Sequence, residues 1–364
     1  MKIQNYFMIS KNNIYIIAEI GVNHNGNLDL AKKLIISAKK SGADAVKFQN
    51  FTADNLAVKN SKKAPYQIKN TKKKESQYIM LKKLELKKND YFYLKDFCIK
   101  KKIEFISSVF DEESVDFLSQ KLKVNFIKVP SGEITNYLIL KKLQKVKNKI
   151  ILSTGMANVK EIIESLNIIA KKNVFELLKN GNVNIKDIKL HKKLKEKVIL
   201  LHCVTDYPVD EKYANLSAID TLQKKLKLDV GYSDHTLGIL APLIAASKGA
   251  KVIEKHLTLN KKMPGPDHKA SLEPDQFKKM IDYVREFEVM NGNGEKILQK
   301  CEVKNINIAR KSIVAKKFIK KNEVFSYFNL TTKRPGNGLS PMNIKKLINK
   351  KAKKNFQPDE LIRL

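Results

Sequence analysis

Two histidines stand at the ends of short β-type runs and could share one divalent ion. A helical stretch, 238–248, separates His235 from His256 in the sequence. Because successive strands of a parallel α/β unit emerge at the same edge of the sheet, the two imidazoles are expected to meet there. Neutral imidazole is a common metal ligand. Three carboxylates lie near the histidines in the sequence: Asp234, Glu254 and Asp267. An isolated histidine at a strand end is more often an ordinary core or surface residue, so this pattern alone leaves both interpretations open.

Two lysines interrupt apolar runs that are typical of buried strands. Lys47 lies within 44–51 and Lys128 within 125–131. A lysine in a buried strand is costly unless its ammonium group meets an anion. Strand side chains alternate between faces, so Lys47 and Gln49 point the same way. The two lysines therefore favour an anion-binding site.

The elements that would position these residues form a repeating β/α pattern. Eight β-type runs are predicted at 14–20, 44–51, 103–109, 125–131, 150–154, 198–204, 228–235 and 251–256. Helices are predicted at 27–40, 75–101 (a pair), 112–120, 158–171, 238–248 and 274–290. The stretch 52–77 is polar and long for a connection, which suggests a lid or substrate loop. Residues 172–196 show weak periodicity and suggest a surface insertion.

This count and spacing predict an α/β fold, a (β/α)₈ TIM barrel. In such barrels the chemistry takes place at the C-terminal ends of the strands. Polar candidates gather at those ends: Glu19, Lys47, Ser108, Lys128, Ser131, Ser153, Tyr207, His235 and His256.

The pattern changes after the last predicted barrel helix. We expect a catalytic barrel domain at 1–290, a linker at 291–304 and a small domain at 305–364. The small domain has β-type runs at 312–315 and 329–332, a short helix at 343–350 and a turn-rich loop that contains Arg334.

The composition argues against nucleic-acid binding despite the high positive charge. The 364-residue chain has a formal net charge of +34, but only four of its 71 basic residues are arginine and the other 67 are lysine. Nucleic-acid readers favour arginine for bidentate contacts, and these lysines are spread along the whole chain. We therefore expect no nucleic-acid partner.

The cysteines and the apolar runs point to a cytoplasmic protein. Three cysteines without a CxxC spacing argue against a disulfide framework. Residues 1–13 contain no continuous apolar run typical of a secretory leader. No apolar run approaches the length that spans a bilayer, so no membrane association is expected.

With these residues in view, the chain resembles the sialic acid synthase family, the nonulosonic acid synthases of bacteria. The resemblance covers nearly the whole chain and is carried by Ala18–Gly26, Lys47–Gln49, Lys128–Glu133, Leu152–Met156, Gly231–His235, Glu254–His256 and Pro264–Asp267. The tail around 333–338 is similar to the antifreeze-protein-like (SAF, β-clip) domain that closes these enzymes.

The resemblance implies a condensation of phosphoenolpyruvate with the open-chain aldehyde of an N-acylated mannose-type sugar. The products would be a nine-carbon 2-keto acid and phosphate. By this similarity His235 and His256 would bind Mn²⁺ or Mg²⁺, and Glu19 would act in proton transfer or position water. Phosphoenolpyruvate would be held by Lys47, Ser108, Lys128, Ser131 and Ser153, and the sugar by Gln49, Tyr207, Asp267 and Arg334.

The family also implies a homodimer in which the SAF domain of one chain covers the barrel of the other, so that Arg334 reaches the partner's site. Within the family, the chain is most similar to the N,N′-diacetyllegionaminate synthases, which act on 2,4-diacetamido-2,4,6-trideoxymannose. This similarity is carried by Lys63–Gln67, Pro130, Ile134–Asn136 and His268–Pro274.

Three alternatives stay open at the level of sequence. The first is the same reaction on N-acetylmannosamine, which would give N-acetylneuraminate. The second is a metal-dependent barrel hydrolase, which would leave Lys47 and Lys128 without an anion. The third is a lysine-rich binding protein with a carbohydrate-type tail domain, which would leave the polar strand ends unexplained.

Overall fold

The computed structural model describes residues 13–363. Residues 1–12, which hold most of the N-terminal stretch considered above, and residue 364 lie outside the described part. The chain divides into two compact units between Gly292 and Asn293. Across residues 13–363, no helix combines the length and the apolar character needed to cross a membrane.

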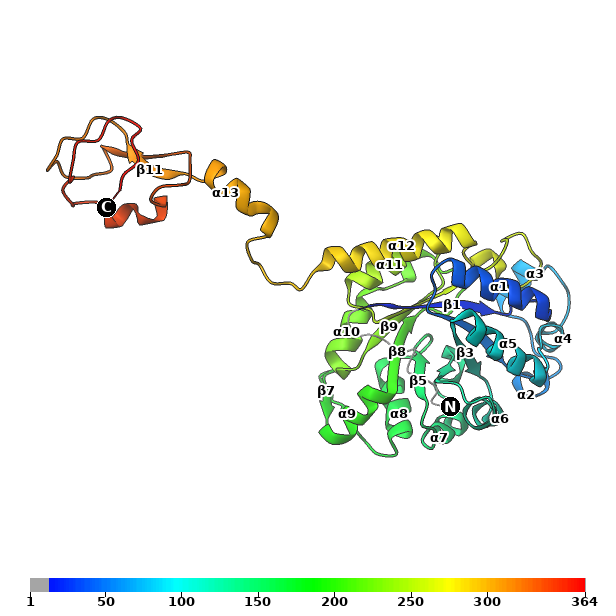
Figure 1. Cartoon of the computed structure of the whole chain (residues 1–364). Coiled ribbons are helices and arrows are strands. Elements are labelled where there is room, and N and C mark those ends of the chain that lie inside the picture. The colour runs from blue at the N-terminus through cyan, green and yellow to red at the C-terminus, as the bar shows by residue number, and fades with distance from the viewer. Residues whose placement is uncertain (1–12, 364) are drawn as a thin grey trace. The chain divides into compact units, whose positions relative to one another are not determined.

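The first unit is a closed barrel of parallel strands, which confirms the predicted TIM barrel (Figure 1). Around the ring the strands follow the order β1-β10-β9-β8-β5-β4-β3-β2. Their bounds are β1 (Tyr15–Gly21), β2 (Ala45–Asn50), β3 (Glu104–Val109), β4 (Phe126–Val129), β5 (Lys149–Ser153), β8 (Val198–Cys203), β9 (Val230–Asp234) and β10 (Val252–His256).

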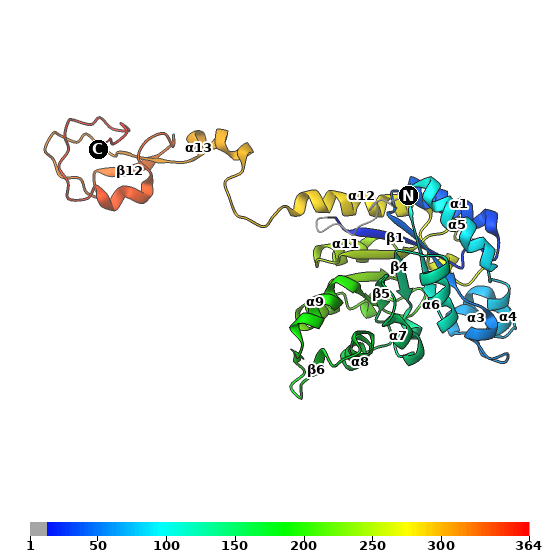
Figure 2. The same ribbon diagram turned by 60° about the horizontal axis from the view of Figure 1, so that its bottom comes forward.

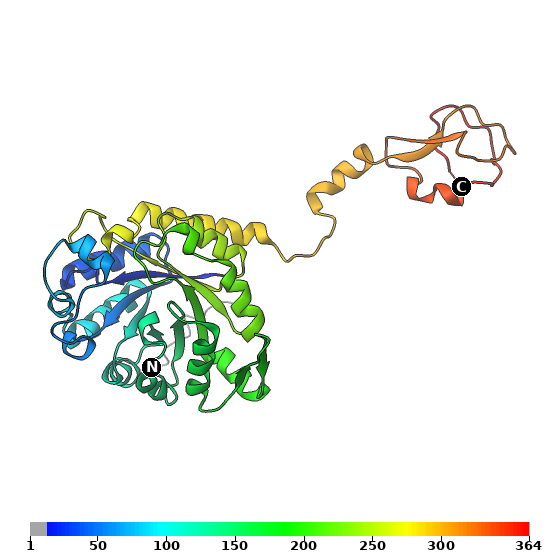
Figure 3. The same ribbon diagram turned by 180° about the vertical axis from the view of Figure 1, so that it is seen from behind.

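Helices cover the outside of this barrel from every side, as Figures 2 and 3 show. They are α1 (Leu28–Lys40), α5 (Lys88–Lys101), α6 (Glu112–Asp116), α7 (Tyr137–Leu143), α8 (Val159–Ala170), α9 (Ile188–Lys197), α10 (Ser217–Leu226), α11 (Leu240–Ser247) and α12 (Pro274–Asn291). A π-helical turn, Phe117–Lys121, extends α6. Apolar side chains fill the layer between the helices and the strands, and α11 packs along α12.

Local sequence signals explain where several of these helices begin. The side chain of Asn27 accepts a hydrogen bond from the backbone N–H of Leu30 at the start of α1. Asn158 and Glu161 form a capping box at the start of α8. Pro274 occupies the first turn of α12, where its missing N–H costs nothing. These signals set the residue at which each of these helices begins.

Strand alternation carries apolar residues and site residues to the same interior face. The barrel interior is filled by Tyr15, Ile17, Ala45, Ile106, Phe126, Ile151, Ile199, Leu201 and Val252. Six of these residues are followed, two positions later on the same strand, by a polar side chain: Glu19, Lys47, Ser108, Lys128, Ser153 and Glu254. Every second side chain of a strand points to the same face. The apolar layer and the polar layer above it therefore come from one alternating pattern.

Two stretches differ from the sequence-based expectation. The predicted loop 52–77 contains α2 (Ala53–Leu56) and α3 (Pro65–Thr71), and α4 (Gln77–Lys82) begins at its end. The predicted surface insertion 172–196 contains the antiparallel pair β6 (Phe175–Leu177) and β7 (Val183–Ile185) and most of α9, which packs against β5 and β8. Part of this stretch therefore completes the helical layer. Its lysine-rich composition masked three buried apolar anchors, Val174, Phe175 and Leu194.

The second unit is built around its own small core. Its antiparallel pair is β11 (Ser312–Ala315) and β12 (Leu330–Lys333). A short helix, α13 (Val303–Ala309), lies within the stretch 293–312. The predicted helix at 343–350 is instead a 3₁₀ segment, Pro341–Lys346. The core consists of Ile313, Ala315, Ile319, Phe325, Leu330, Leu347, Ala352, Phe356 and Ile362.

A buried ion pair joins β9 to β10 outside the barrel interior. Lys255 is fully buried and its ammonium group contacts the carboxylate of Asp234 and the carbonyl of Thr236. The other oxygen of Asp234 accepts hydrogen bonds from the hydroxyl of Tyr232 at 3.0 Å and from the backbone N–H of Thr236 at 2.9 Å. The pair therefore ties together the strand ends that carry His235 and His256.

We expect Lys255→Met to lower the free energy of unfolding by about 3–5 kcal/mol, because it leaves the Asp234 carboxylate buried without its cation. Urea denaturation measures this change. The matched control is Lys278→Met, because Lys278 is 57 % exposed and pairs with Asp282 at 2.8 Å on a helix surface. The control should cost about 0–1 kcal/mol. Equal losses in the two variants would contradict a structural role for the buried pair.

Candidate functional site

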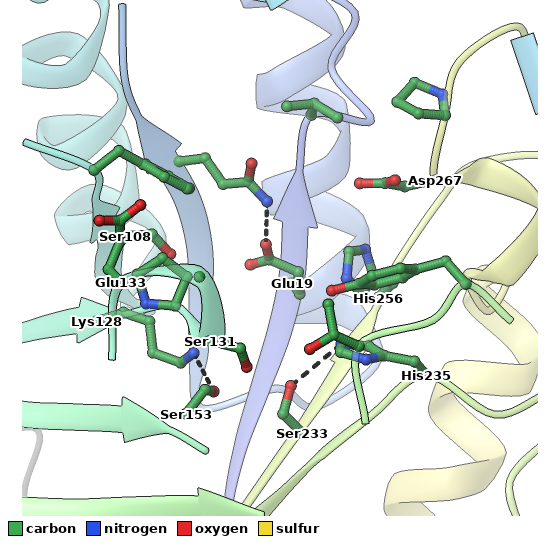
Figure 4. Close-up of a pocket in the computed structure, with 18 of the residues that line it drawn as sticks. Glu19, Ser108, Lys128, Ser131, Glu133, Ser153, Ser233, His235, His256 and Asp267 are labelled. Atoms are coloured by element: carbon green, nitrogen blue, oxygen red, sulfur yellow. Dashed lines mark hydrogen bonds between the residues drawn. The ribbon is translucent and has the colours of Figure 1, made fainter. Parts of the chain in front are cut away.

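A cavity of about 330 Å³ opens at the C-terminal ends of the barrel strands (Figure 4). All the site residues predicted in the first unit line it: Glu19, Lys47, Gln49, Ser108, Lys128, Ser131, Ser153, Tyr207, His235, His256 and Asp267. In Figure 4, Lys128, Ser131 and Ser153 face His235 and His256 across the cavity, with Glu19 between the two groups. The predicted set, from seven of the barrel's strand ends and from the segments that follow β4, β8 and β10, is therefore brought together.

Arg334, the remaining predicted site residue, belongs to the second unit. Its side chain is exposed, and its Nε donates a hydrogen bond to the carbonyl oxygen of Ala309 at 3.0 Å. The predicted role of Arg334 in sugar binding stays a prediction.

Four buried charges form the floor of the cavity. The ammonium group of Lys47 lies 2.7 Å from a carboxylate oxygen of Glu19 and 3.8 Å from one of Glu254. The ammonium group of Lys128 lies 3.7 Å from the same Glu254 oxygen. All four side chains are at most 5 % exposed. Two cations are thus balanced by two carboxylates in a place that water barely reaches.

Burial and pairing compete in setting the protonation of the floor, and at Lys128 burial prevails and lowers the pKa of the ammonium group. Burial disfavours the ammonium form of Lys47, but the carboxylates of Glu19 and Glu254 outweigh this, so the pKa of Lys47 is raised. Burial raises the pKa of Glu19, although Lys47 opposes the change. Glu19 is therefore the floor carboxylate for which accepting a proton costs least.

Hydroxyl groups surround the two ammonium groups. Lys47 donates to the Oγ of Ser108 at 3.2 Å, and Lys128 donates to the Oγ of Ser153 at 2.5 Å. The Oγ of Ser131 accepts the backbone N–H of Gly155 at 3.1 Å. Ammonium groups with neighbouring hydroxyls can hold phosphate or carboxylate oxygens.

His235 is held in one tautomer. Its Nδ1 lies 2.7 Å from the carbonyl oxygen of Val204, so Nδ1 carries the proton and Nε2 keeps its lone pair. Burial lowers the pKa of His235 to about 4, so the ring is neutral near pH 7. A neutral imidazole whose other nitrogen is fixed by a carbonyl has the arrangement that metal-binding histidines use.

The two imidazoles fit a divalent ion. Their ring centroids are 5.6 Å apart, and burial lowers the pKa of His256 well below its usual value. The Nδ1 of His256 and the Oε2 of Glu254 are buried without a hydrogen-bond partner, which is unusual for native polar atoms. Within residues 13–363, no group of three or more His, Cys, Asp or Glu side chains is arranged to hold a metal. Water or substrate would therefore have to complete the coordination of an ion held by these two rings.

Aromatic side chains form the roof over the imidazoles. The ring of Tyr207 lies 4.1 Å from the ring of His235 and 4.8 Å from that of Tyr66, measured between centroids. Tyr66 comes from α3, which is tied to the opposite loop because the Nδ2 of Asn70 donates to the carbonyl oxygen of Pro266 at 2.6 Å. Residues of the stretch 52–77 thus line the cavity, and a role of this stretch as a lid or substrate loop stays a prediction.

Sequence reasoning missed several of the lining residues, among them a group from this stretch and from the segment 77–84: Tyr66, Gln67, Gln77, Met80, Leu81 and Leu84. The motif 63–67 was a signal for the first two. The others had none, because their approach to the cavity depends on how α3 and α4 fold back. Glu254 had been noted only as a carboxylate near the histidines, yet it belongs to the floor.

Asp267 is a second carboxylate with an altered pKa. Burial, assisted by the nearby carboxylate of Glu19, raises the pKa of Asp267 to about 7. Between about pH 4 and pH 7 the folded protein therefore keeps a proton that the unfolded chain releases. This contribution to stability is fully present below about pH 4 and is lost as the pH rises through 7.

We expect Asp267→Asn to become more stable relative to the wild type as the pH rises from 5 to 7.5. The difference in unfolding free energy should change by no more than about 1.4 kcal/mol per pH unit. Urea denaturation over this pH series measures it, with Asp282→Asn as the control for the loss of an exposed carboxylate. A difference that stays constant with pH would show that Asp267 does not hold a proton in the folded state.

Comparison with known proteins gives one consistent family. Residues 34–296 match the NeuB family model and residues 310–364 match the SAF domain model. The N,N′-diacetyllegionaminic acid synthase of Campylobacter jejuni subsp. jejuni serotype O:2 is 52 % identical, over 96 % of this chain and 98 % of that protein. The synthase of the same name from Legionella pneumophila is 41 % identical, over 94 % of this chain and 91 % of that protein.

A solved structure agrees with this assignment. The N-acetylneuraminic acid synthetase of Leptospira borgpetersenii serovar Hardjo-bovis, in complex with citrate, matches with a TM-score of 0.66 and 32 % identity. The match covers 81 % of this chain and 90 % of that one. The resemblance to sialic acid synthases is confirmed, and the chain belongs to the NeuB family, with a SAF domain at 310–364.

Proposed function

We propose that this chain is a phosphoenolpyruvate-dependent transferase that forms a carbon–carbon bond. It condenses phosphoenolpyruvate with 2,4-diacetamido-2,4,6-trideoxymannose to give N,N′-diacetyllegionaminate and phosphate. The observation that carries the proposal is the pairing, in one buried cavity, of two lysines among hydroxyls with two neutral imidazoles. The 52 % identity to a relative with this activity in its name supports the choice of sugar.

The lysine side of the cavity suits the anionic substrate. Lys47 and Lys128 would hold the phosphate and carboxylate of phosphoenolpyruvate, with Ser108, Ser131 and Ser153 as further donors. An anion arriving here would take over part of the pairing that Glu19 and Glu254 now provide. This accounts for lysines in strands where an apolar residue would otherwise pack.

The imidazole side suits the aldehyde. His235 and His256 would hold Mn²⁺ or Mg²⁺, which when bound supplies a Lewis acid that polarises the aldehyde oxygen. The sugar would be oriented by Gln49, Tyr207 and Asp267. In this arrangement the methylene carbon of phosphoenolpyruvate bonds to the aldehyde carbon, and the aldehyde oxygen gains a proton.

Glu19 is suited to move the proton that the reaction requires. The overall reaction consumes one water, whose oxygen remains in the keto acid or the phosphate. Glu19 lies between the two sides of the cavity, and its Oε1 accepts a hydrogen bond from the Nε2 of Gln49 at 3.0 Å. Its raised pKa suits a group that takes a proton from water and returns it.

The assembly is also part of the proposal. The active form would be a homodimer in which Arg334 of one chain reaches the sugar bound by the other. The catalytic domain would span 1–290 and the SAF domain 305–364, joined by a linker at 291–304. A cytoplasmic location is supported by the three cysteines, Cys98, Cys203 and Cys301, which are all unpaired.

A second candidate is the same reaction on N-acetylmannosamine, which gives N-acetylneuraminate. The 32 % identity to the Leptospira N-acetylneuraminic acid synthetase favours keeping it. It uses the same floor and the same imidazoles, so only the sugar distinguishes the two candidates.

The test is phosphate release by the full chain with phosphoenolpyruvate, Mn²⁺ and each sugar in turn, with the product mass determined. We expect faster turnover of the trideoxy sugar and loss of activity with EDTA. A preference for N-acetylmannosamine would move the protein to neuraminate synthesis. If neither sugar released phosphate, the proposed reaction would be wrong.

A further inference from the structure

One side of the cavity is apolar and serves no step of the reaction described so far. It consists of Val22, Leu56, Met80, Leu81, Leu84 and Phe110, which we call the apolar wall. These six residues belong to one apolar cluster, separate from the main core of the barrel. Val22, Met80 and Leu84 are buried, whereas Leu56, Leu81 and Phe110 are only partly covered.

Part of the apolar wall lies across the barrel from His235, whereas Val22 follows β1, the neighbour of the strand that carries His256. Phe110 follows β3, which stands directly across the ring from β9, the strand that leads into His235. Leu56 belongs to α2, and Met80 and Leu81 belong to α4, in the excursion between β2 and β3. The ring of Phe110 packs edge to face against the ring of Phe51, with centroids 5.8 Å apart. The wall is therefore a packed surface rather than a set of loose side chains.

We propose that the apolar wall receives the methyl group at C6 of the sugar and thereby selects a 6-deoxy substrate. This inference rests on the proposed function, because that function places the aldehyde carbon, C1, at the imidazoles. An extended open-chain sugar held at C1 points its C6 end toward the opposite side of the cavity. In the trideoxy sugar that end is a methyl group, which gains from burial against leucine, methionine and phenylalanine side chains.

The same wall disfavours a sugar with a 6-hydroxyl. A hydroxyl pressed against the wall gives up its hydrogen bonds to water without replacement. The amide of the neighbouring Gln67 is already engaged: its Oε1 accepts from the backbone N–H of Ala64 at 2.9 Å and from the Nε2 of Gln77 at 3.3 Å. Its Nε2 donates to the hydroxyl of Tyr66 at 3.3 Å. The wall thus favours a methyl group over a hydroxyl at C6.

Two sugars that differ only at C6 test this directly: 2-acetamido-2,6-dideoxymannose and 2-acetamido-2-deoxymannose. Phosphate release by the full chain gives kcat/KM for each. We expect the wild type to prefer the 6-deoxy sugar by about 10-fold or more, the range of one buried group in an apolar pocket. Leu81→Asn, which places an amide on the wall, should reduce this ratio by roughly 10-fold and leave KM for phosphoenolpyruvate unchanged.

The matched control is Ile79→Asn, because Ile79 lies on the same helix but is 45 % exposed and does not line the cavity. It should keep the wild-type ratio. Phe110→Tyr is the second wall variant and decides the question if Leu81→Asn does not fold.

Equal use of both sugars by the wild type, or an unchanged ratio in the folded wall variants, would overturn the inference and leave the reaction intact. Absence of phosphate release from these sugars and from the trideoxy sugar would overturn the proposed function, and the inference with it.

Discussion

The buried charge cluster at the floor of the cavity is the constraint on which the rest of the site depends. Lys47 and Lys128 are nearly inaccessible to water, and within residues 13–363 the carboxylates that form ion pairs with them are those of Glu19 and Glu254. Breaking such a cluster by removing one member leaves an uncompensated charge. An arriving anion can instead replace a carboxylate as the partner of a lysine. The floor is therefore stable when empty and also prepared for a substrate with negative charge.

The barrel makes this cluster possible through a single alternating pattern. Ile17 and Phe126 pack inside the barrel, and Glu19 and Lys128 follow them at the next interior positions. The apolar layer below keeps water out, and α3 and the loop after β10 bring Tyr66 and Asp267 to the cavity. Chemistry at the strand ends and stability at the barrel centre thus come from the same strands.

Most of the barrel and of its polar layer could be predicted from sequence, because both follow short-range periodicity. Lys47 and Lys128 were identifiable because a lysine within an apolar strand is costly to bury unless it meets an anion. Gln77 and Leu81 were not, because they reach the cavity only through the folding back of α3 and α4, which no local pattern encodes. Leu194 was missed because the apolar stripe that it forms with Leu190 on α9 is short and stands among many lysines. Arg334 could be named only through family resemblance.

The most direct test of this account is the affinity of phosphoenolpyruvate for the charged floor, measured by isothermal titration calorimetry. Lys128→Met is compared with Lys160→Met, which removes a lysine whose side chain is 71 % exposed. We expect Lys128→Met to weaken binding by about 10-fold or more, since charge-assisted hydrogen bonds contribute roughly 1.5–3 kcal/mol each. The control should bind as the wild type does. Equal affinity in all three proteins would contradict the claim that the buried lysines are the anion site.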